Sequence, residues 1–190
     1  MGTASHDHTW RLWDAETGAN LLLQDGHIRE VGSVAFQGDG ALAASTDHAG
    51  VVRVWDLRSG RGVATFQGHV GRVLCAAWHP NGYQVVTGGD DHTCRVWDLR
   101  RRKEAFSLLA HSGVVSDVRW APSDDARGEL LLTASLDGSA KLWSARNYMP
   151  LATFKGHESK VMGIDFAPDS RSIVTAGYDR TFKVWSEPYL

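Results

Sequence analysis

Residues 69–109 read HVGRVLCAAWHPNGYQVVTGGDDHTCRVWDLRRRKEAFSLL, and this stretch decides the fold. It is rich in β-branched and aromatic residues and is interrupted by turn residues such as Pro, Asn and Gly. Four segments suit strands: 73–78, 83–87, 93–97 and 104–109. Because no segment has the 3.6-residue apolar period of a helix, the stretch predicts a unit of four consecutive strands.

The same unit recurs along the chain. Five of the eight Trp residues are spaced by 42, 42, 46 and 42 residues: Trp13, Trp55, Trp97, Trp143 and Trp185. A His series keeps step with them: His27, His69, His111 and His157. The longer interval holds four extra residues, which we place in the polar stretch 122–129. A period in the low forties with Gly-His and Trp-Asp landmarks is typical of β-propeller blades, so the expected fold is all-β.

The repeat also predicts the organisation of the chain. The expected units are a half repeat at 1–25, repeats at 26–67 and 68–109, a repeat with the four-residue insertion at 110–155, and a last repeat at 156–190 that lacks its fourth strand. Seven such blades need roughly 300 residues, so the expected architecture is part of a seven-bladed ring. In an alternative, the strand around 21–23 completes the last repeat and closes a four-bladed ring.

A polar set accompanies each Trp. A Ser or Thr stands ten residues before it and an Asp six residues before it, except that the unit ending at Trp55 has Ala49 there and Asp47 two places earlier. Asp, His, hydroxyl and indole N–H are expected to form a hydrogen-bonded chain, since buried polar groups need partners. We predict a reshaped turn and a weaker network in the Trp55 unit. The remaining members of this structural network are Thr87, Asp91, Thr133, Asp137, Thr175 and Asp179.

These repeated His, Asp and hydroxyl groups resemble catalytic triads, but a catalytic site is normally built once and this set recurs at equal spacing. No metal-ligand spacing, P-loop or dinucleotide motif occurs in the sequence, so we expect no enzyme activity, metal, cofactor or small-molecule substrate. The longest apolar run has six residues, too short for a membrane span, and no membrane partner is expected. Cys75 and Cys94 fall in strands and are expected to be inert core thiols of a reducing compartment.

Two sets of residues are candidates for partner contacts. A net charge of −2 argues against a mainly electrostatic nucleic-acid binder, and only one basic run could touch RNA or an acidic surface: Arg100, Arg101, Arg102 and Lys103. We expect the residues three and five after each His to lie on one strand face at the rim of the central channel. Apart from the small Gly32, they are Glu30, Arg72, Leu74, Val114, Ser116, Lys160 and Met162. Their chemical variety favours a surface adapted to a protein partner.

The Gly-His and Trp-Asp landmarks resemble the signature of the WD40-repeat family over the whole chain. Residues 7–14, 91–100 and 178–185 are similar to segments of one branch of it, the WD-repeat proteins of the U4/U6 small nuclear ribonucleoprotein. The last segment, which contains YDRTFK, corresponds to the final blade of that branch. The resemblance implies a scaffold for pre-mRNA splicing in the nucleus, with spliceosomal proteins as partners and U4/U6 RNA contacted at most indirectly. The resemblance covers only the propeller of that branch, so the binding partners of the region that precedes the propeller there are not carried over.

Two other functions remain open. Substrate receptors of cullin-type ubiquitin ligases often carry Trp-Asp-x-Arg, which occurs here at 55–58 and 97–100. An Arg in that place also suits a solvated turn after the third strand. A generic WD40 adaptor is the other alternative, in which case the similarity to the splicing branch would be coincidental.

Overall fold

The computed structural model describes residues 1–122, 130–168 and 171–186, and these form strands and turns. The first sheet contains β1 (Gly2–Ala4), β2 (Trp10–Trp13) and β3 (Asn20–Gln24). The second contains β4 (Val31–Phe36), β5 (Leu42–Asp47), β6 (Val51–Asp56) and β7 (Arg61–Gln67). The third contains β8 (Val73–Trp78), β9 (Gln84–Gly89), β10 (Thr93–Asp98) and β11 (Lys103–Leu109).

Two further sheets complete the described chain. The fourth contains β12 (Val115–Trp120), β13 (Leu130–Ser135), β14 (Ser139–Ser144) and β15 (Pro150–Lys155). The fifth contains β16 (Val161–Phe166), β17 (Ser172–Gly177) and β18 (Phe182–Ser186). The predicted insertion loop and the last residues, 123–129 and 187–190, lie outside the described residues. None of the described residues forms a helix, so this part of the chain contains no apolar helix of membrane-spanning length.

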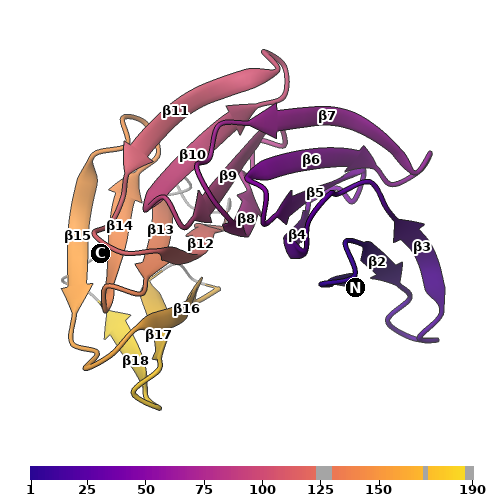
Figure 1. The fold of residues 1–190 in the computed structure, drawn as a ribbon. Coiled ribbons are helices and arrows are strands. Elements are labelled where there is room, and N and C mark those ends of the chain that lie inside the picture. The colour runs from indigo at the N-terminus through magenta and orange to yellow at the C-terminus, as the bar shows by residue number, and fades with distance from the viewer. Residues whose placement is uncertain (123–129, 169–170, 187–190) are drawn as a thin grey trace.

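The five antiparallel sheets stand side by side along an open arc (Figure 1). The first strands of neighbouring sheets lie next to one another: β4 beside β8, β8 beside β12, and β12 beside β16. This arrangement confirms the prediction of an all-β, partial β-propeller. The alternative of a four-bladed ring is wrong, because β3 hydrogen-bonds to β2 and the first and last sheets lie at opposite ends of the arc.

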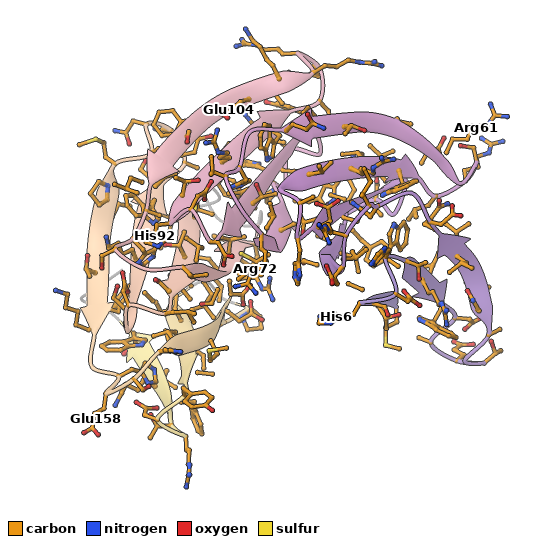
Figure 2. All side chains as sticks on the ribbon, viewed as in Figure 1. His6, Arg61, Arg72, His92, Glu104 and Glu158 are labelled. Carbon is orange, nitrogen blue, oxygen red and sulfur yellow. The ribbon has the colours of Figure 1, made fainter. Side chains whose placement is uncertain are left out.

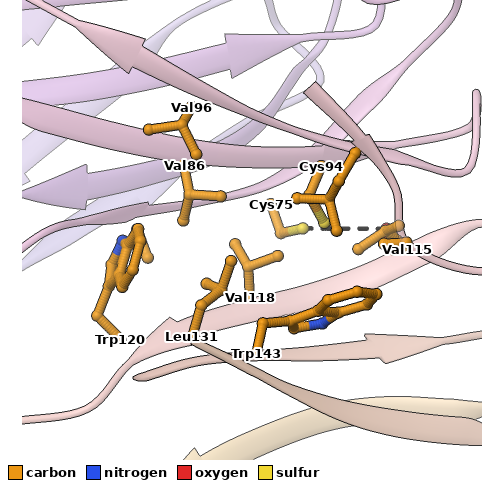
Figure 3. Packing of buried hydrophobic residues seen from close by; sticks show 12 residues of the cluster. Cys75, Val86, Cys94, Val96, Val115, Val118, Trp120, Leu131 and Trp143 are labelled. Atoms are coloured by element: carbon orange, nitrogen blue, oxygen red, sulfur yellow. Dashed lines mark hydrogen bonds between the residues drawn. The ribbon is translucent and has the colours of Figure 1, made fainter. Parts of the chain in front are cut away.

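The second, third and fourth sheets each bury both of their faces between their neighbours. Between the third and fourth sheets, Val86, Cys94 and Val96 pack against Val118 and Leu131 (Figure 3). All except Cys94 are aliphatic, and a fully buried aliphatic side chain stabilises the fold by about 1.5–3 kcal/mol. The blade-to-blade contacts are therefore the hydrophobic core of the molecule.

Both cysteines belong to this core. Cys75 and Cys94 are free, buried thiols, and the Sγ atom of Cys75 faces the carbonyl oxygens of Gly88 and Val115. Burial raises the pKa of both thiols well above the ordinary value. Because the thiolate is the reactive form, neither group is poised for chemistry, as the sequence indicated.

The outer face of the fifth sheet is not covered by any described residue. Phe182 and Val184 point from this face and are 74% and 60% exposed. The residues at the same blade positions in the third sheet, Cys94 and Val96, are fully buried because the fourth sheet covers them. Phe182 and Val184 thus form an apolar surface of the type that elsewhere in this chain receives a further blade.

Candidate interaction surface

The polar set of the third blade forms one continuous chain of hydrogen bonds. The indole Nε1–H of Trp97 donates to the hydroxyl oxygen of Thr87 at 2.8 Å. That oxygen lies 2.7 Å from Nε2 of His69, whose Nδ1 lies 2.9 Å from a carboxylate oxygen of Asp91. A neutral imidazole protonated on Nδ1 satisfies every member, since Nε2 then accepts the hydroxyl proton. The set joins β9, β10, the turn between them and the loop that precedes β8.

The same order of contacts recurs in three other blades. The groups are Asp47, His27, Ser45 and Trp55; Asp137, His111, Thr133 and Trp143; and Asp179, His157, Thr175 and Trp185. In the first sheet, Trp13 donates to Thr3 at 2.8 Å, and Asp7 instead accepts from Thr9. These four equivalent sets bind the strands of each blade together.

The expectation of a weaker network in the Trp55 blade is wrong. The Asp47 carboxylate lies 2.7 Å from Nδ1 of His27, so the chain of contacts is complete. The turn is reshaped as expected, because Asp47 is the last residue of β5 and also accepts the backbone N–H groups of Ala49 and Val51. A carboxylate that stands two residues earlier in the sequence therefore still contacts the network His of its blade, because the turn that follows it has a different shape.

Burial determines the charge state of these groups. Desolvation lowers the pKa of three network histidines below the ordinary value, although the neighbouring carboxylate acts in the opposite direction: His27, His69 and His111. Burial alone would raise the pKa of Asp137, but hydrogen bonds from Ser139 and the proximity of His111 lower it to about 2. At neutral pH these three imidazoles are therefore neutral, and Asp137 is ionised beside His111.

The network hydroxyls cannot act as nucleophiles in this arrangement. Thr87, Thr133 and Ser45 are fully buried, and each oxygen already accepts an indole N–H. A catalytic hydroxyl needs a free lone pair and access to substrate. No group of three or more His, Cys, Asp or Glu side chains in the described residues is arranged to hold a metal ion. The geometry is that of a structural cross-link.

The residue three after each network His lies just before the first strand of its blade. In every complete set its carbonyl oxygen accepts the backbone N–H of the residue seven before the Trp: Glu30 from His48, Arg72 from Asp90, Val114 from Leu136, and Lys160 from Tyr178. The side chains of these pairs differ greatly. Arg72 forms an ion pair with Asp90 at 2.6 Å, whereas Val114 and Leu136 are apolar. Figure 2 shows Arg72 on the concave side of the arc.

The residue five after the His is placed differently from our expectation. Gly32, Leu74, Ser116 and Met162 each lie at a register shift in the first strand, a β-bulge. Because a bulge re-aims side chains, the residues three and five after the His do not share one regular strand face. The hydroxyl of Ser116 donates to the carbonyl of Val161 at 2.7 Å, so this side chain joins two blades. Met162 is 48% exposed.

The basic run occupies the turn between β10 and β11. The guanidinium of Arg100 lies 3.3 Å from the ring centroid of Tyr83 and pairs with Asp98 at 3.2 Å. Arg101 lies 4.0 Å from the same carboxylate and is well exposed. Arg102 has a left-handed backbone with φ 52°, and Lys103 begins β11. Arg100 is therefore held within its blade, while the other three cations face solvent.

Aligning the blades reveals a cationic position that the sequence reasoning missed. The residue two before every repeat Trp is basic: Arg11, Arg53, Arg95, Lys141 and Lys183. Arg95 pairs with Glu104 of the neighbouring strand at 2.5 Å. The signal was visible in the aligned repeats, but its meaning depends on which acid lies across the sheet.

The chain belongs to the WD40 family, described as "WD domain, G-beta repeat", whose model matches residues 19–56, 60–98, 102–144 and 148–186. Each matched unit starts shortly before the last strand of one sheet and runs through the third strand of the next, from β3 to β6 in the first case. Consecutive sequence units therefore interlock, because each one contributes strands to two blades.

Curated relatives match over short stretches. A U4/U6 small nuclear ribonucleoprotein PRP4-like protein of Arabidopsis thaliana is 48% identical over 59 residues, which cover 31% of this chain and 11% of the relative. The U4/U6 small nuclear ribonucleoprotein Prp4 of Mus musculus is 58% identical over 36 residues, or 19% of this chain and 7% of the relative. Eukaryotic translation initiation factor 3 subunit I of Drosophila willistoni is 37% identical over 62 residues, or 33% of this chain and 19% of the relative. The chain thus spans less than a fifth of the length of each.

Proposed function

We propose that the chain is a non-catalytic protein-interaction scaffold whose contacts lie along the rim. The observation that carries this proposal is the variation at the residues three after the network His. All four make the same backbone hydrogen bond, yet their side chains are Glu, Arg, Val and Lys. A position with a purely structural role would favour one chemistry, whereas a surface that recognises partners needs a different group at each point.

Within this class, we propose a role in pre-mRNA splicing, as a nuclear component of the U4/U6 ribonucleoprotein or the tri-snRNP. The support is the identity of 48% and 58% to two proteins whose names place them in the U4/U6 particle. The partners would be spliceosomal proteins, with any contact to U4/U6 RNA made indirectly. A translation factor subunit matches at lower identity, so the test must distinguish the two settings.

Affinity purification of the tagged chain from nuclear and cytoplasmic extract tests this assignment. We expect recovery of U4/U6 proteins and RNA. Recovery of translation initiation subunits instead would contradict the splicing role but not the scaffold role. The double variant Arg72→Glu with Lys160→Glu should lose partners and keep its thermal stability, because neither side chain belongs to the hydrogen-bonded networks. Asp137→Ala should show the reverse, with a loss of about 1–3 kcal/mol from unpaired buried groups.

The ligase-receptor alternative rests on the Arg of Trp-Asp-x-Arg. In one of its two copies, Arg100 is engaged by Asp98 and Tyr83 of its own blade. An arginine held in this way has a structural explanation without a ligase partner. Ligase subunits in the same purification would favour the alternative.

A contact between the basic run and RNA or an acidic surface is a separate proposal. Its support is the exposure of Arg101, Arg102 and Lys103 on one turn. Replacing all four cations of the run by Ala should leave the fold intact and reduce the salt dependence of particle binding. An unchanged salt dependence would rule the contact out.

A further inference from the structure

A cleft of about 710 Å³ opens between the β13–β14 turn and the loop that joins β15 to β16. Its walls come from the fourth sheet and from the first residues leading into the fifth. Figure 2 shows Glu158, on that loop, pointing away from the body of the molecule. The volume lies in the range of ligand-binding sites, which is about 300–1,000 Å³.

Three cations from three elements line this cleft: Lys141 on β14, Lys155 at the end of β15, and Lys160 at the start of the next blade. In the chain as described, residues 1–122, 130–168 and 171–186, no hydrogen bond or ion pair engages the ammonium groups of Lys155 and Lys160. The ammonium of Lys141 donates to the carbonyl of Ala110 at 2.7 Å, which uses one of its three donors. Ser112, Thr153 and Ser159 add hydroxyl groups to the lining.

The third blade shows how such a cation is neutralised in this protein, whereas in the second blade Arg53 has Gly62, not an acid, opposite Trp55. Arg95 holds the place of Lys141 and pairs with Glu104, the residue across the sheet near Trp97. In the cleft blade that acid is replaced by Pro150, which lies opposite Trp143. The cation of this blade is kept while its acidic neighbour is absent.

The same substitution occurs at the rim. Arg72 holds the place of Lys160 and pairs with Asp90 at 2.6 Å. The residue that corresponds to Asp90 beside Lys160 is Tyr178, whose backbone N–H makes the recurrent bond to the Lys160 carbonyl. Lys141 and Lys160, which line the same opening, thus both lack the acidic partner that the corresponding arginine has in the third blade.

The two acids of the lining offset only part of the charge of the three lysines, so the lining stays net positive. Asp137 accepts hydrogen bonds from the backbone and hydroxyl groups of both Ser112 and Ser139 and contacts His111, so its oxygens are committed to the network. Glu158 is the other acid, and it projects outward from the loop (Figure 2). The three lysines and the hydroxyls of Thr153 and Ser159 are therefore available to an incoming anion.

We propose that this cleft binds a multiply charged anionic segment of a protein partner, a run of carboxylates or a phosphorylated side chain. Ammonium groups that converge from three elements suit a ligand with several negative oxygens. The side chain absent at Gly138 contributes to the opening, since the corresponding residue in the third blade is His92. This site deepens the proposed scaffold function and rests on it, because it names the chemistry of one partner.

Fluorescence anisotropy with labelled peptides tests the proposal on the 190-residue chain. One probe is a short peptide with four consecutive glutamates, the second carries a phosphoserine in their place, and the third is a uridine-rich single-stranded RNA of similar length. We expect at least one peptide to bind. Its affinity should decrease when the salt concentration is raised from 50 mM to 200 mM. Preference for the first or second peptide identifies the source of the charge.

Matched variants assign the binding to the cleft. Lys155→Gln with Lys160→Gln should weaken peptide binding roughly tenfold. Arg58→Gln with Arg61→Gln, which removes two exposed cations at the β6–β7 turn, should leave it unchanged. Glu158→Gln should tighten binding, a result that a poorly folded variant cannot produce. Pro150→Glu should weaken binding, because the new carboxylate would stand near Lys141 as Glu104 stands near Arg95 in the third blade.

Absence of peptide binding, equal loss in both double variants, or a clear preference for RNA would overturn the proposal. The outcome is separable from that of the purification experiment. Splicing components recovered by a chain that binds no acidic peptide would preserve the scaffold function and reject the cleft. Peptide binding through the lysines without recovery of any protein complex would preserve the cleft and reject the scaffold.

Discussion

Replacing Thr133 by Val removes a single hydroxyl at the centre of a buried network. That oxygen accepts the indole N–H of Trp143 at 2.9 Å and lies 2.8 Å from Nε2 of His111. Val has nearly the same shape, so the packing of β13 is retained. Two buried polar groups lose their partner, each at a cost of about 1–3 kcal/mol. Since the two losses share one site and are not additive, we expect unfolding free energy to fall by about 2–4 kcal/mol.

The chain contains its own control for this substitution. Thr3 in the first sheet accepts an indole N–H from Trp13 at 2.8 Å, but the pair is exposed and has no network His. Water can replace the lost hydroxyl there, so Thr3→Val should cost less than about 1 kcal/mol. Thr133→Ser should retain most of the stability, because Ser45 makes both equivalent bonds in the second blade, at 2.6 and 2.7 Å.

Urea unfolding followed by far-UV circular dichroism measures these differences. With an m-value of about 2 kcal/mol per molar urea, Thr133→Val should lower the midpoint by about 1–2 M. Equal midpoints for Thr133→Val and Thr3→Val would refute the reasoning, because the buried bridge would then stabilise no more than an exposed bond. A Ser variant as unstable as the Val variant would refute it as well, since the hydroxyl would not be the group responsible.

Three further perturbations follow from the same contacts. The network histidines with lowered pKa are neutral when folded but bind protons near pH 6.5 when unfolded, so their contribution to stability is present above that pH and is lost as the pH falls through it. Melting temperatures should therefore decline from pH 7.5 to 4.5, and a flat profile would contradict this. Asp137, with a pKa of about 2, acts in the same direction only below pH 4. Gly50→Ala should lower the free energy of unfolding in urea by about 2 kcal/mol or more, because φ is +86° and the new Cβ would meet the His69 carbonyl oxygen at 2.8 Å. In the control Gly40→Ala the new Cβ meets no atom within 4 Å, so only the backbone strain of about 1 kcal/mol is expected. Phe182→Ser with Val184→Ser should reduce concentration-dependent self-association, measured by light scattering, because it makes the uncovered apolar face polar. Unchanged scattering would show that self-association does not occur through this face.

The strands were predictable because their periodicity is strong and repeated. The segment 73–78 coincides with β8, and 93–97 differs from β10 by one residue. The β-bulges were not predictable, because the bulged residues Leu74 and Met162 have no feature that distinguishes them from ordinary strand residues. A bulge depends on how two strands pair, and that information is not local.

The candidate site likewise has one part that was predictable from the sequence and one part that was not. The Asp-His-hydroxyl-Trp contacts followed from spacing, since each group recurs at a fixed distance from its Trp. Asp47 could not be placed from spacing alone, because its reach to His27 depends on the shape of one turn. The lysine cleft was missed for a related reason. Lys141 and Lys155 gain significance only from the acids that are absent across the sheet, and strand register determines which residues those are.

Repetition makes it possible to separate the groups that the fold needs from those that it does not. Arg95 and Arg72 stand in blades that also provide Glu104 and Asp90, so their charges are neutralised by their own surroundings. The fourth blade and the start of the fifth keep the cations and omit both acids. If the fold required those ion pairs, their loss would destabilise these blades; yet surface pairs contribute only about 0–1 kcal/mol, so the fold tolerates it. What remains is net positive charge at a cleft between two blades, and we expect a partner to be recognised there.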